Sequence, residues 1–430
     1  MNPSSALAPH SYVPQDQLYV WALLNPAAPT LVGEVGLSPL VVDCAQFRYA
    51  PSWWQLALSE DLPILQGQTF STGQKNTAPG ALDDARPDRW GERIIRYILR
   101  PARLSILEML LFAGIDRFGA LGIATSAQHY QPMAFAPYPQ LRDVAQMAAA
   151  VESLQNQQTL SADMQRLIQP GVSLGGARPK ALLQMAGATE GKAQPPQTCI
   201  IKFGELGEPI DTPLIEHASM TLAAKAGMHM AATAVLPLPP QQGRARHAIT
   251  IARFDRAGAY RLHCLSAHSA LRAAGLPYGY SPLASVLLRL GHPDRQNAMR
   301  EELFKRMVFN ILIDNTDDHE RNHSLCLNLA DGYYDLSPAY DVLPSLQSLG
   351  YQAMIVGDMG AQSSLENALG QIKEYGIKMP RAIALVQQVA RVVDGWAQHF
   401  RALGVVAADM EQLAASIDRP ALRQQRLELL

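Results

Sequence analysis

Apolar residues alternate with polar ones in several short stretches of the chain, and Pro or Gly separates these stretches. The segments LYVWALL, TLVGEVG and LVVDCAQFRYA, between Gln17 and about Tyr49, have this character, which is typical of β-strands. We therefore predict a small β-rich subdomain near the start of the chain. TCIIKF, ATAVLPLPP and HAITIARFDRAG predict further strands in the middle of the chain.

A helical spacing of apolar residues replaces the strand pattern elsewhere. It predicts helices over four segments: Leu104–Ile115, Leu141–Ile168, Pro213–Gly227 and Glu301–Ile313. From about Ser364 onward the pattern is mostly helical, and KMPRAIALVQQVARVVDGWAQHF is amphipathic. SLCLNLADGYYDLS predicts two short strands joined by a turn at Asp331 and Gly332.

The composition limits the class of protein. At 430 residues the chain can form two or three domains, and 48% hydrophobic with 17% charged residues is the balance of a soluble globular protein. A net charge of −2 and a pI of about 6.6 exclude an overall basic surface for nucleic acid, though not a local basic patch. The four cysteines are scattered without a C-x-x-C pair, which favours reduced thiols. With no signal-peptide pattern and no apolar run of ~18 residues, we expect a cytoplasmic protein that is not inserted in a membrane.

Candidate chemistry is concentrated in NTDDHERNHSLCL, residues 315–327, and in YYDLSPAYDVLP, residues 333–344. Phosphoryl transfer needs a carboxylate to orient the attacking hydroxyl and oxygen ligands for Mg²⁺, and kinase catalytic loops separate base and metal Asn in the order D-x-x-x-x-N. Asp317 and Asn322 have that separation, and Asp341 follows the predicted hairpin as a second metal ligand. Taken alone, the motif is more often a solvated helix exit, because Asp and Asn are common in caps and turns.

A second group of candidates lies upstream in VSLGGARPKALLQMA, residues 172–186. Gly175 and Gly176 allow the backbone to approach a phosphate closely, and Ser173, Arg178 and Lys180 supply a hydroxyl and positive charge. The alternative for a Gly-Gly pair is an ordinary turn.

Two further segments continue the kinase order. Lys202 ends the strand TCIIKF, where a lysine can neutralise nucleotide phosphates, although a surface lysine on an edge strand is the alternative. Glu216 is expected in the first turn of its helix, where the dipole favours a carboxylate, and it can also pair with Lys202. In RFDR, Phe254 either contacts a nucleotide base at a hinge or is a core residue.

The candidate segments occur along the chain in the order found in a two-lobed kinase. That order is a glycine loop, a lysine at a strand end, a glutamate on a helix, a hinge, the D-x-x-x-x-N motif and a final Asp. Together, SLGGARPKALL, IIKF, ARFDR, NTDDHERN and SPAYDVLP resemble the signature segments of the HipA family of serine/threonine kinases, the toxins of bacterial toxin–antitoxin pairs. The resemblance runs from about Tyr19 through the C-terminal helices. It implies an α+β, two-lobed, protein-kinase-like (HipA-like) fold with a small N-terminal β-rich subdomain and a mostly helical C-terminal lobe. The expected domains are 11–130, 131–255 with the glycine loop and ATP-binding strands, and 256–430 as the catalytic lobe.

The resemblance also implies roles for single residues. Asp317 would be the catalytic base, Asn322 and Asp341 would bind Mg²⁺, and Ser173 would be autophosphorylated, which displaces the glycine loop and disables ATP binding. The residues implied at the ATP site are Gly175, Gly176, Ala177, Arg178, Pro179, Lys180, Lys202, Glu216, Ala252, Arg253, Phe254, His319, Glu320, Arg321, Asn322, Tyr340 and Asp341.

Partners and rival functions follow from the same resemblance. Substrates of the family include an aminoacyl-tRNA synthetase, whose modification halts translation. The cognate antitoxin is a small DNA-binding protein, and nucleic acid is reached only indirectly through it.

This chain departs from some members at Ala252, where they carry Glu, and at Arg178-Pro179. The departure at Ala252 motivates an alternative function, a nucleotide-binding regulator with little or no kinase activity. A small-molecule kinase on the same scaffold is a third.

Overall fold

The chain folds into two compact units, each assembled from two separate stretches of sequence. The computed structural model describes residues 11–133, 135, 137–170, 176–189, 192–241 and 243–428. Unit 1 comprises Met1–Glu205 and Arg253–Ala274, and unit 2 comprises Leu206–Ala252 and Gly275–Leu430. The three domains expected from the sequence, 11–130, 131–255 and 256–430, remain a prediction.

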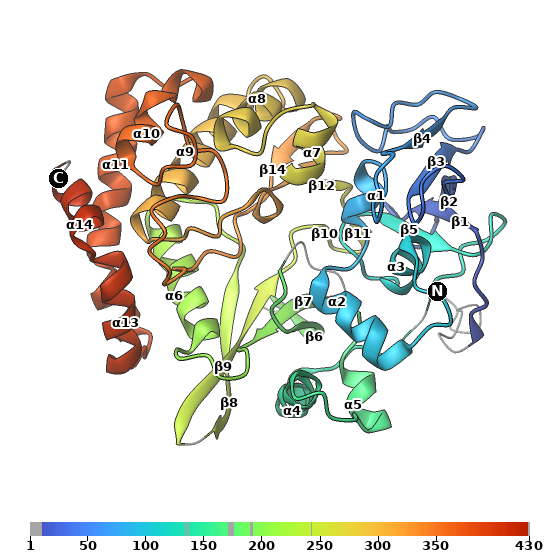
Figure 1. Cartoon of the computed structure of the whole chain (residues 1–430), viewed down its shortest axis with the longest axis horizontal. Helices are drawn as coiled ribbons and strands as arrows, with labels where there is room; N and C mark the ends of the chain where they lie inside the picture. Colours follow the sequence, from blue (N-terminus) through green and yellow to red (C-terminus); the bar gives the residue numbers. More distant parts are fainter. Residues whose placement is uncertain are drawn as a thin grey trace. The chain divides into compact units, whose positions relative to one another are not determined.

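Unit 1 begins with an antiparallel five-stranded sheet in the order β4-β3-β2-β1-β5 (Figure 1). Its strands are β1 Gln17–Ala22, β2 Thr30–Leu37, β3 Ala45–Tyr49, β4 Thr69–Ser71 and β5 Leu121–Ala124. Leu18, Val20, Val35 and Phe47 are fully buried on its inner face, which explains the apolar alternation of these strands. The first residues of LVVDCAQFRYA are a loop instead of strand, because Asp43 adopts a left-handed φ of 54°.

The helices of unit 1 are short. They are α1 Ala81–Asp84, α2 Arg89–Ile94, α3 Ile106–Phe112, α4 Val144–Gln155, α5 Ala162–Leu167 and α7 Ala267–Ala273, with a π-helical turn Ile95–Leu99 after α2. Of these, α3 packs against strands β2 and β5 of the five-stranded sheet. The helix expected over 141–168 is wrong as a single element. Gln157 adopts a left-handed φ of 58° and Ser161 caps a new helix through the Met164 amide, so α4 and α5 form separately.

Unit 1 also contains a long antiparallel pair of strands, β6 Lys180–Thr189 and β7 Lys192–Phe203. Three short strands complete it: β10 Arg256–Ala257, β11 Tyr260–Arg261 and β12 Cys264–Ser266. The strand predicted at TCIIKF is therefore the second half of β7.

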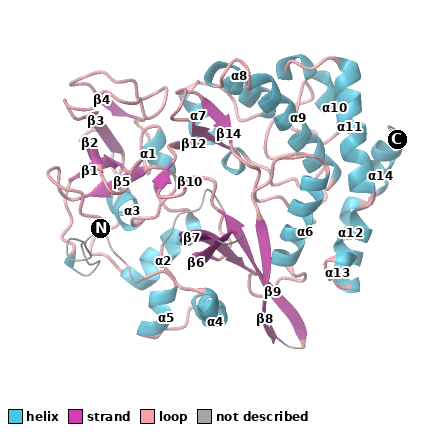
Figure 2. Ribbon diagram, turned by 180° about the vertical axis from the view of Figure 1, so that it is seen from behind, coloured by secondary structure: helices cyan, strands magenta, loops and turns pink. Residues whose placement is uncertain are grey.

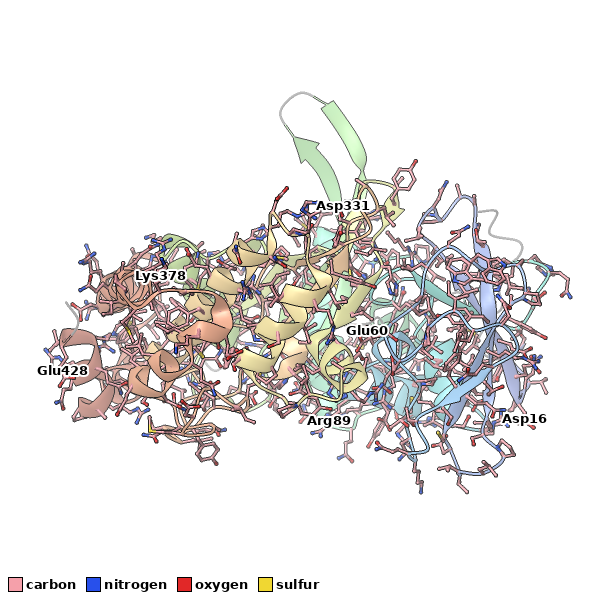
Figure 3. The ribbon with its side chains drawn as sticks, turned by 90° about the horizontal axis from the view of Figure 1, so that it is seen from above. Asp16, Glu60, Arg89, Asp331, Lys378 and Glu428 are labelled. Carbon is pink, nitrogen blue, oxygen red and sulfur yellow. The ribbon has the colours of Figure 1, made fainter. Side chains whose placement is uncertain are left out.

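Unit 2 combines two antiparallel strand pairs with a helical body. Its strands are β8 Thr233–Gln241 and β9 Arg244–Ala252, which run together in both ribbon views (Figure 1, Figure 2), and the short pair β13 Ser324–Leu327 and β14 Tyr334–Leu336. Asp331, labelled in Figure 3, lies in the turn between β13 and β14, as the sequence predicted. The helices are α6 Thr212–Lys225, α8 Tyr280–Leu290, α9 Gln296–Leu312, α10 Leu365–Gly370, α11 Met379–Asp394, α12 Trp396–Ala402, α13 Ala407–Ile417 and α14 Pro420–Leu427.

The helix α9 is the central support of unit 2. It begins five residues before the expected start at Glu301, and Leu303, Phe304, Met307 and Val308 on it are fully buried. Within the part of the chain that the structure describes, no helix is both long enough and apolar enough to cross a membrane.

Candidate phosphotransfer site

The end of α9 leads directly into the loop that carries the candidate base. Asp314, just past the helix, is fully buried with a left-handed φ of 59°. Its carboxylate accepts hydrogen bonds from Ser416 Oγ and, at 3.1 Å, from Arg419 Nη2. The loop thus begins from a fixed carboxylate that pairs with Arg419, between α13 and α14, and accepts a hydrogen bond from Ser416 of α13.

A second buried carboxylate, Asp318, organises the middle of the loop. It accepts hydrogen bonds from Asn310 Nδ2 at 2.8 Å, from His323 Nε2 at 2.9 Å and from the Tyr280 hydroxyl. Burial by itself would raise the pKa of Asp318, but the charge of His323 and these hydrogen bonds outweigh it and hold the pKa below its usual range. Asp318 is therefore an anionic anchor for the loop.

Asp317 differs from all of its neighbours in exposure. Every residue from 303 to 328 is described, and Asp317 is the only one of them that is exposed. The amide of Asn322 donates to the backbone carbonyl of Asp317 at 3.4 Å, so the two ends of the D-x-x-x-x-N motif lie together. The loop thus presents one carboxylate to solvent on a buried polar scaffold, which is the arrangement a general base for an incoming hydroxyl requires.

Asn322 and His319 carry buried polar atoms that lack a hydrogen-bond partner among the described residues. These atoms are Asn322 Oδ1 and His319 Nδ1, and Asn322 is only 4% exposed. A buried acceptor without a partner costs stability unless a ligand satisfies it. Because an amide oxygen is a ligand that Mg²⁺ accepts, the residues present fit the metal that the family implies. The described residues contain no cluster of three His, Cys, Asp or Glu side chains arranged for a metal ion, but a site built from one Asn, one Asp and nucleotide phosphates needs no such cluster.

Tyr340 ties the second candidate metal ligand to the same loop. Its buried hydroxyl donates to the carbonyl oxygen of Arg321 at 2.9 Å and lies 2.8 Å from Ser324 Oγ. Asp341, the next residue, has a left-handed φ of 59°, a strained conformation that often marks functional sites. The structure therefore joins Asp317 to Asn322 and holds Tyr340, the residue before Asp341, against the same loop of unit 2.

The remaining candidates of unit 2 lie on other elements. Glu216 is 1% exposed and belongs to the second turn of α6, because that helix begins at Thr212. The first-turn expectation is therefore wrong, and the helix dipole acts less on this carboxylate. Ala252 is the exposed last residue of β9, and Glu320 and Arg321 are half-buried in the 3-10 turn Glu320–Asn322.

In unit 1, the two candidate lysines face each other across β6 and β7. Lys180 pairs directly with Lys202 in the antiparallel register, and they are 5% and 7% exposed. Like charges opposite each other destabilise a strand pair unless anions compensate them. Asp88, the N-cap of α2, lies 2.8 Å from Lys180 Nζ and supplies one such anion. Two buried ammonium groups on one face are suited to bind phosphate.

The glycine segment before β6 is described only in part. Ser173 and Gly175 lie outside the described residues. Gly176 has a φ of 92°, and a side chain there would come 3.1 Å from Lys180 Nζ. Gly176 and Ala177 are exposed, Arg178 is half-buried and Pro179 is buried. The positive φ is the conformation for which glycine is suited.

The RFDR segment is built into a buried ionic cluster of unit 1. We call this the arginine–aspartate cluster: Asp116, Arg253, Asp255, Arg256 and Arg261. Arg253 Nε and Nη2 donate to the two oxygens of Asp255 at 2.9 and 2.7 Å. The Phe254 ring packs edge-on against Phe118, with centroids 6.1 Å apart. A nucleotide contact from this segment stays a prediction.

Sequence reasoning missed the residues that support the candidate site. Asp88 and Lys180 are 92 positions apart, and Tyr280 and Asp318 are 38 apart. No local pattern joins such pairs. The alternation along β6 and β7 could have placed both lysines on one face.

Comparison with known proteins decides the family. Over residues 172–396, more than half of the chain, the sequence matches the family described as HipA-like C-terminal domain. This chain belongs to the HipA family. The matched range contains every candidate residue of this HipA-family chain, from Ser173 to Asp341.

A solved structure supports the fold. One match is to HipA of Shewanella oneidensis MR-1, described as a toxin–antitoxin system of HipA, HipB and its operator DNA, with 17% identity, 96% of each chain covered and a TM-score of 0.60. At this identity the likeness shows fold, and the expected α+β, HipA-like kinase fold is confirmed. The Helicobacter pylori proinflammatory kinase CtkA is 11% identical over 54% of this chain and 90% of its own, with a TM-score of 0.39, which is too low to bear on the argument.

Proposed function

We propose that this HipA-family chain is an ATP- and Mg²⁺-dependent serine/threonine protein kinase and the toxin of a toxin–antitoxin pair. The observation that carries the proposal is the contrast within one loop, where Asp317 is the only exposed residue and the buried Asn322 Oδ1 finds no partner among the residues that the structure describes. A base open to solvent beside an unsatisfied metal-type ligand is what phosphoryl transfer to a hydroxyl requires.

Each candidate residue has a part in this proposal. Asp317 orients the substrate hydroxyl and accepts its proton, while Asn322 and Asp341 hold the metal. Mg²⁺ supplies charge neutralisation for the phosphates when bound. Lys180 and Lys202 attract the nucleotide phosphates.

The partners are proposed from the family and from the description of the Shewanella structure, which names HipB and operator DNA. We expect a small DNA-binding antitoxin as partner, with nucleic acid reached only through it. We also expect a translation component such as an aminoacyl-tRNA synthetase as substrate, inhibition by autophosphorylation at Ser173, and a cytoplasmic location.

The proposal is tested by incubating the protein with γ-labelled ATP and Mg²⁺ and locating the label. We expect phosphate on Ser173 in the wild type and a loss of at least about a hundredfold in Asp341→Ala, because transfer depends on positioning and charge. Asp294→Ala is the matched control, since that carboxylate is 89% exposed in the same unit. Wild-type transfer by Asp341→Ala would contradict the proposal.

The same experiment separates the rival functions. The exposed Ala252, at the position where some family members carry Glu, favours a nucleotide-binding regulator as the second candidate. Thermal stabilisation by ATP without any transferred label would support the regulator. ATP consumption that rises only with an added metabolite would support a small-molecule kinase.

A further inference from the structure

A segment that follows Asp341 exposes apolar side chains and is bonded through its backbone to the residue before the candidate base. From 351 to 356 its residues alternate strictly between exposed and buried. The inward residues are Gln352, Met354 and Val356, at 2%, 0% and 0% exposure. The outward residues are Tyr351, Ala353 and Ile355. The inward side chains fix the segment on unit 2, and this fixes the direction of the outward ones.

Backbone hydrogen bonds attach this segment directly to the catalytic loop. The Ala353 amide donates to the carbonyl oxygen of Thr316, the residue before Asp317, at 3.1 Å. The Ile355 amide donates to the Tyr278 carbonyl at 3.0 Å, and the Tyr280 amide donates back to Ile355 at 3.0 Å. Tyr280 in turn bonds Asp318. The position of the outward side chains is therefore coupled to that of the base.

We call the outward surface formed by Tyr278, Tyr351 and Ile355 the apolar face. Their exposed fractions are 38%, 54% and 37%, and Leu349 and Met359 of the same segment are exposed as well. Asp358 is the only Asp, Glu, Lys, Arg or His between 344 and 364. A segment that brings no cation of its own does not by itself suit a phosphate or a nucleic-acid backbone. Tyrosine and Met enrichment with depletion of charge is typical of the centre of a protein interface.

We propose that the apolar face binds the substrate polypeptide at apolar residues that flank the phosphorylated Ser or Thr, and so selects the phosphorylation site. The inference rests on the proposed kinase function. An extended polypeptide advances about 3.3 Å per residue. With its hydroxyl at Asp317, residues within about four positions of the acceptor pass over the surface that adjoins Thr316. Ala353, bonded to Thr316, lies between Tyr351 and Ile355 of the apolar face along the chain. A polypeptide, unlike a metabolite, has flanking residues that extend from Asp317 toward this face.

The test is a positional peptide library phosphorylated with labelled ATP and Mg²⁺. One flanking position at a time, up to four residues from a central Ser, is fixed as Leu, Lys or Glu, and kcat/KM is compared within each enzyme. We expect the wild type to prefer Leu over Glu about tenfold at one position or more, the gain from burying roughly one aliphatic side chain. In Ile355→Glu and Tyr351→Glu the Leu preference is lost and Lys is favoured. Val406→Glu, at a 50% exposed apolar residue elsewhere in unit 2, keeps the wild-type preference.

The readout is independent of how much of a variant folds, because both terms of each ratio come from the same preparation. Transfer without a Leu preference, or a preference that neither variant alters, overturns the inference and leaves the kinase function standing. Transfer to the protein itself with none to any peptide also overturns it. If the wild type transfers no phosphate to any acceptor in an Asp317-dependent way, the proposed function fails and the inference fails with it.

Discussion

Two groups of buried charged residues in this chain look alike in sequence and differ in structure. In the arginine–aspartate cluster of unit 1, Asp255 accepts hydrogen bonds from Arg253, Arg256 and the Gly119 amide, and Arg253 is 3% exposed. In the candidate loop of unit 2, Asp318 is equally buried and bonded, but Asp317 beside it is exposed and Asn322 Oδ1 has no partner among the described residues.

The difference separates charges that hold a fold from charges available for chemistry. The charged groups of the cluster pair with one another, so we expect them to contribute to stability. Removing one member leaves a buried charge uncompensated. In the loop, Asp314 and Asp318 are buried and hydrogen-bonded, whereas Asp317 is exposed and Asn322 Oδ1 has no partner in the part of the chain that the structure describes. Substitutions in the cluster should therefore change stability, and substitutions in the loop should change activity.

Replacing the exposed base has the largest expected effect. Asp317→Asn removes the proton acceptor but keeps the shape of the side chain, so we expect phosphate transfer to fall about a thousandfold. The thermal midpoint should move little, because the side chain is exposed. Labelled-ATP assays and calorimetry on one preparation check both halves. If the thermal midpoint fell strongly and the activity were retained, Asp317 would support the fold and would not act in phosphate transfer.

Removing the central anion of the cluster gives the next largest effect. Asp255→Ala leaves Arg253 and Arg256 without their shared carboxylate, so we expect the free energy of unfolding to fall by about 3 kcal/mol. Burial would raise the pKa of Asp255, but the charges of Arg253 and Arg256 lower it to about 2, consistent with strong pairing. Denaturant unfolding measures the change.

The matched control for Asp255 is Asp16, labelled in Figure 3, which pairs with Arg103 but is 81% exposed. Asp16→Ala should cost less than about 1 kcal/mol, because solvent screens such a pair. If both variants lost the same free energy of unfolding, burial would not determine how much these ion pairs stabilise the protein.

A buried histidine of unit 1 should make stability depend on pH. Burial lowers the pKa of His263 to about 4, although a hydrogen bond to the Leu58 carbonyl opposes the shift. The unfolded histidine titrates near 6.5, so between these pH values only the unfolded chain binds the proton, and stability falls as the pH falls. We expect a loss of about 2 kcal/mol between about pH 7.5 and pH 5 that is smaller in His263→Gln. The exposed His129→Gln should behave as the wild type.

The smallest expected effect concerns the unsatisfied amide oxygen. Asn322→Ala removes one proposed metal ligand, so we expect the Mg²⁺ concentration for half-maximal ATP binding to rise about tenfold. Titration calorimetry with a non-hydrolysable ATP analogue measures it, and chelation of Mg²⁺ should abolish the difference. Asn328→Ala, in the hairpin turn after β13, is the control. An unchanged Mg²⁺ requirement would remove Asn322 from the metal site.

The sequence predicted what depends on local pattern. The strands β1 and β2, the helix α9 and the turn at Asp331 follow from alternation, helical spacing and turn residues, and the D-x-x-x-x-N spacing brought Asp317 and Asn322 together as candidates. The break between α4 and α5 was missed because the backbone reverses at Gln157, a residue with no turn preference of its own.

Contacts between residues far apart in the sequence could not be predicted from local pattern. The partners of Arg253 in the cluster include the backbone of Asp116, 137 positions away, and such contacts depend on the packing of whole elements. The sequence could therefore name the residues of the loop but not those that hold it in place.

The burial of Asp314 links the catalytic loop to parts of the chain made much later by the ribosome. Its partners Ser416 and Arg419 are 102 and 105 positions further on. A nascent chain that stops before them already contains Asp317, Asn322 and Asp341, yet the carboxylate at the base of their loop would lack two of its donors. We expect such a translation intermediate to be unable to phosphorylate its surroundings until the distal helices have been synthesised and have docked.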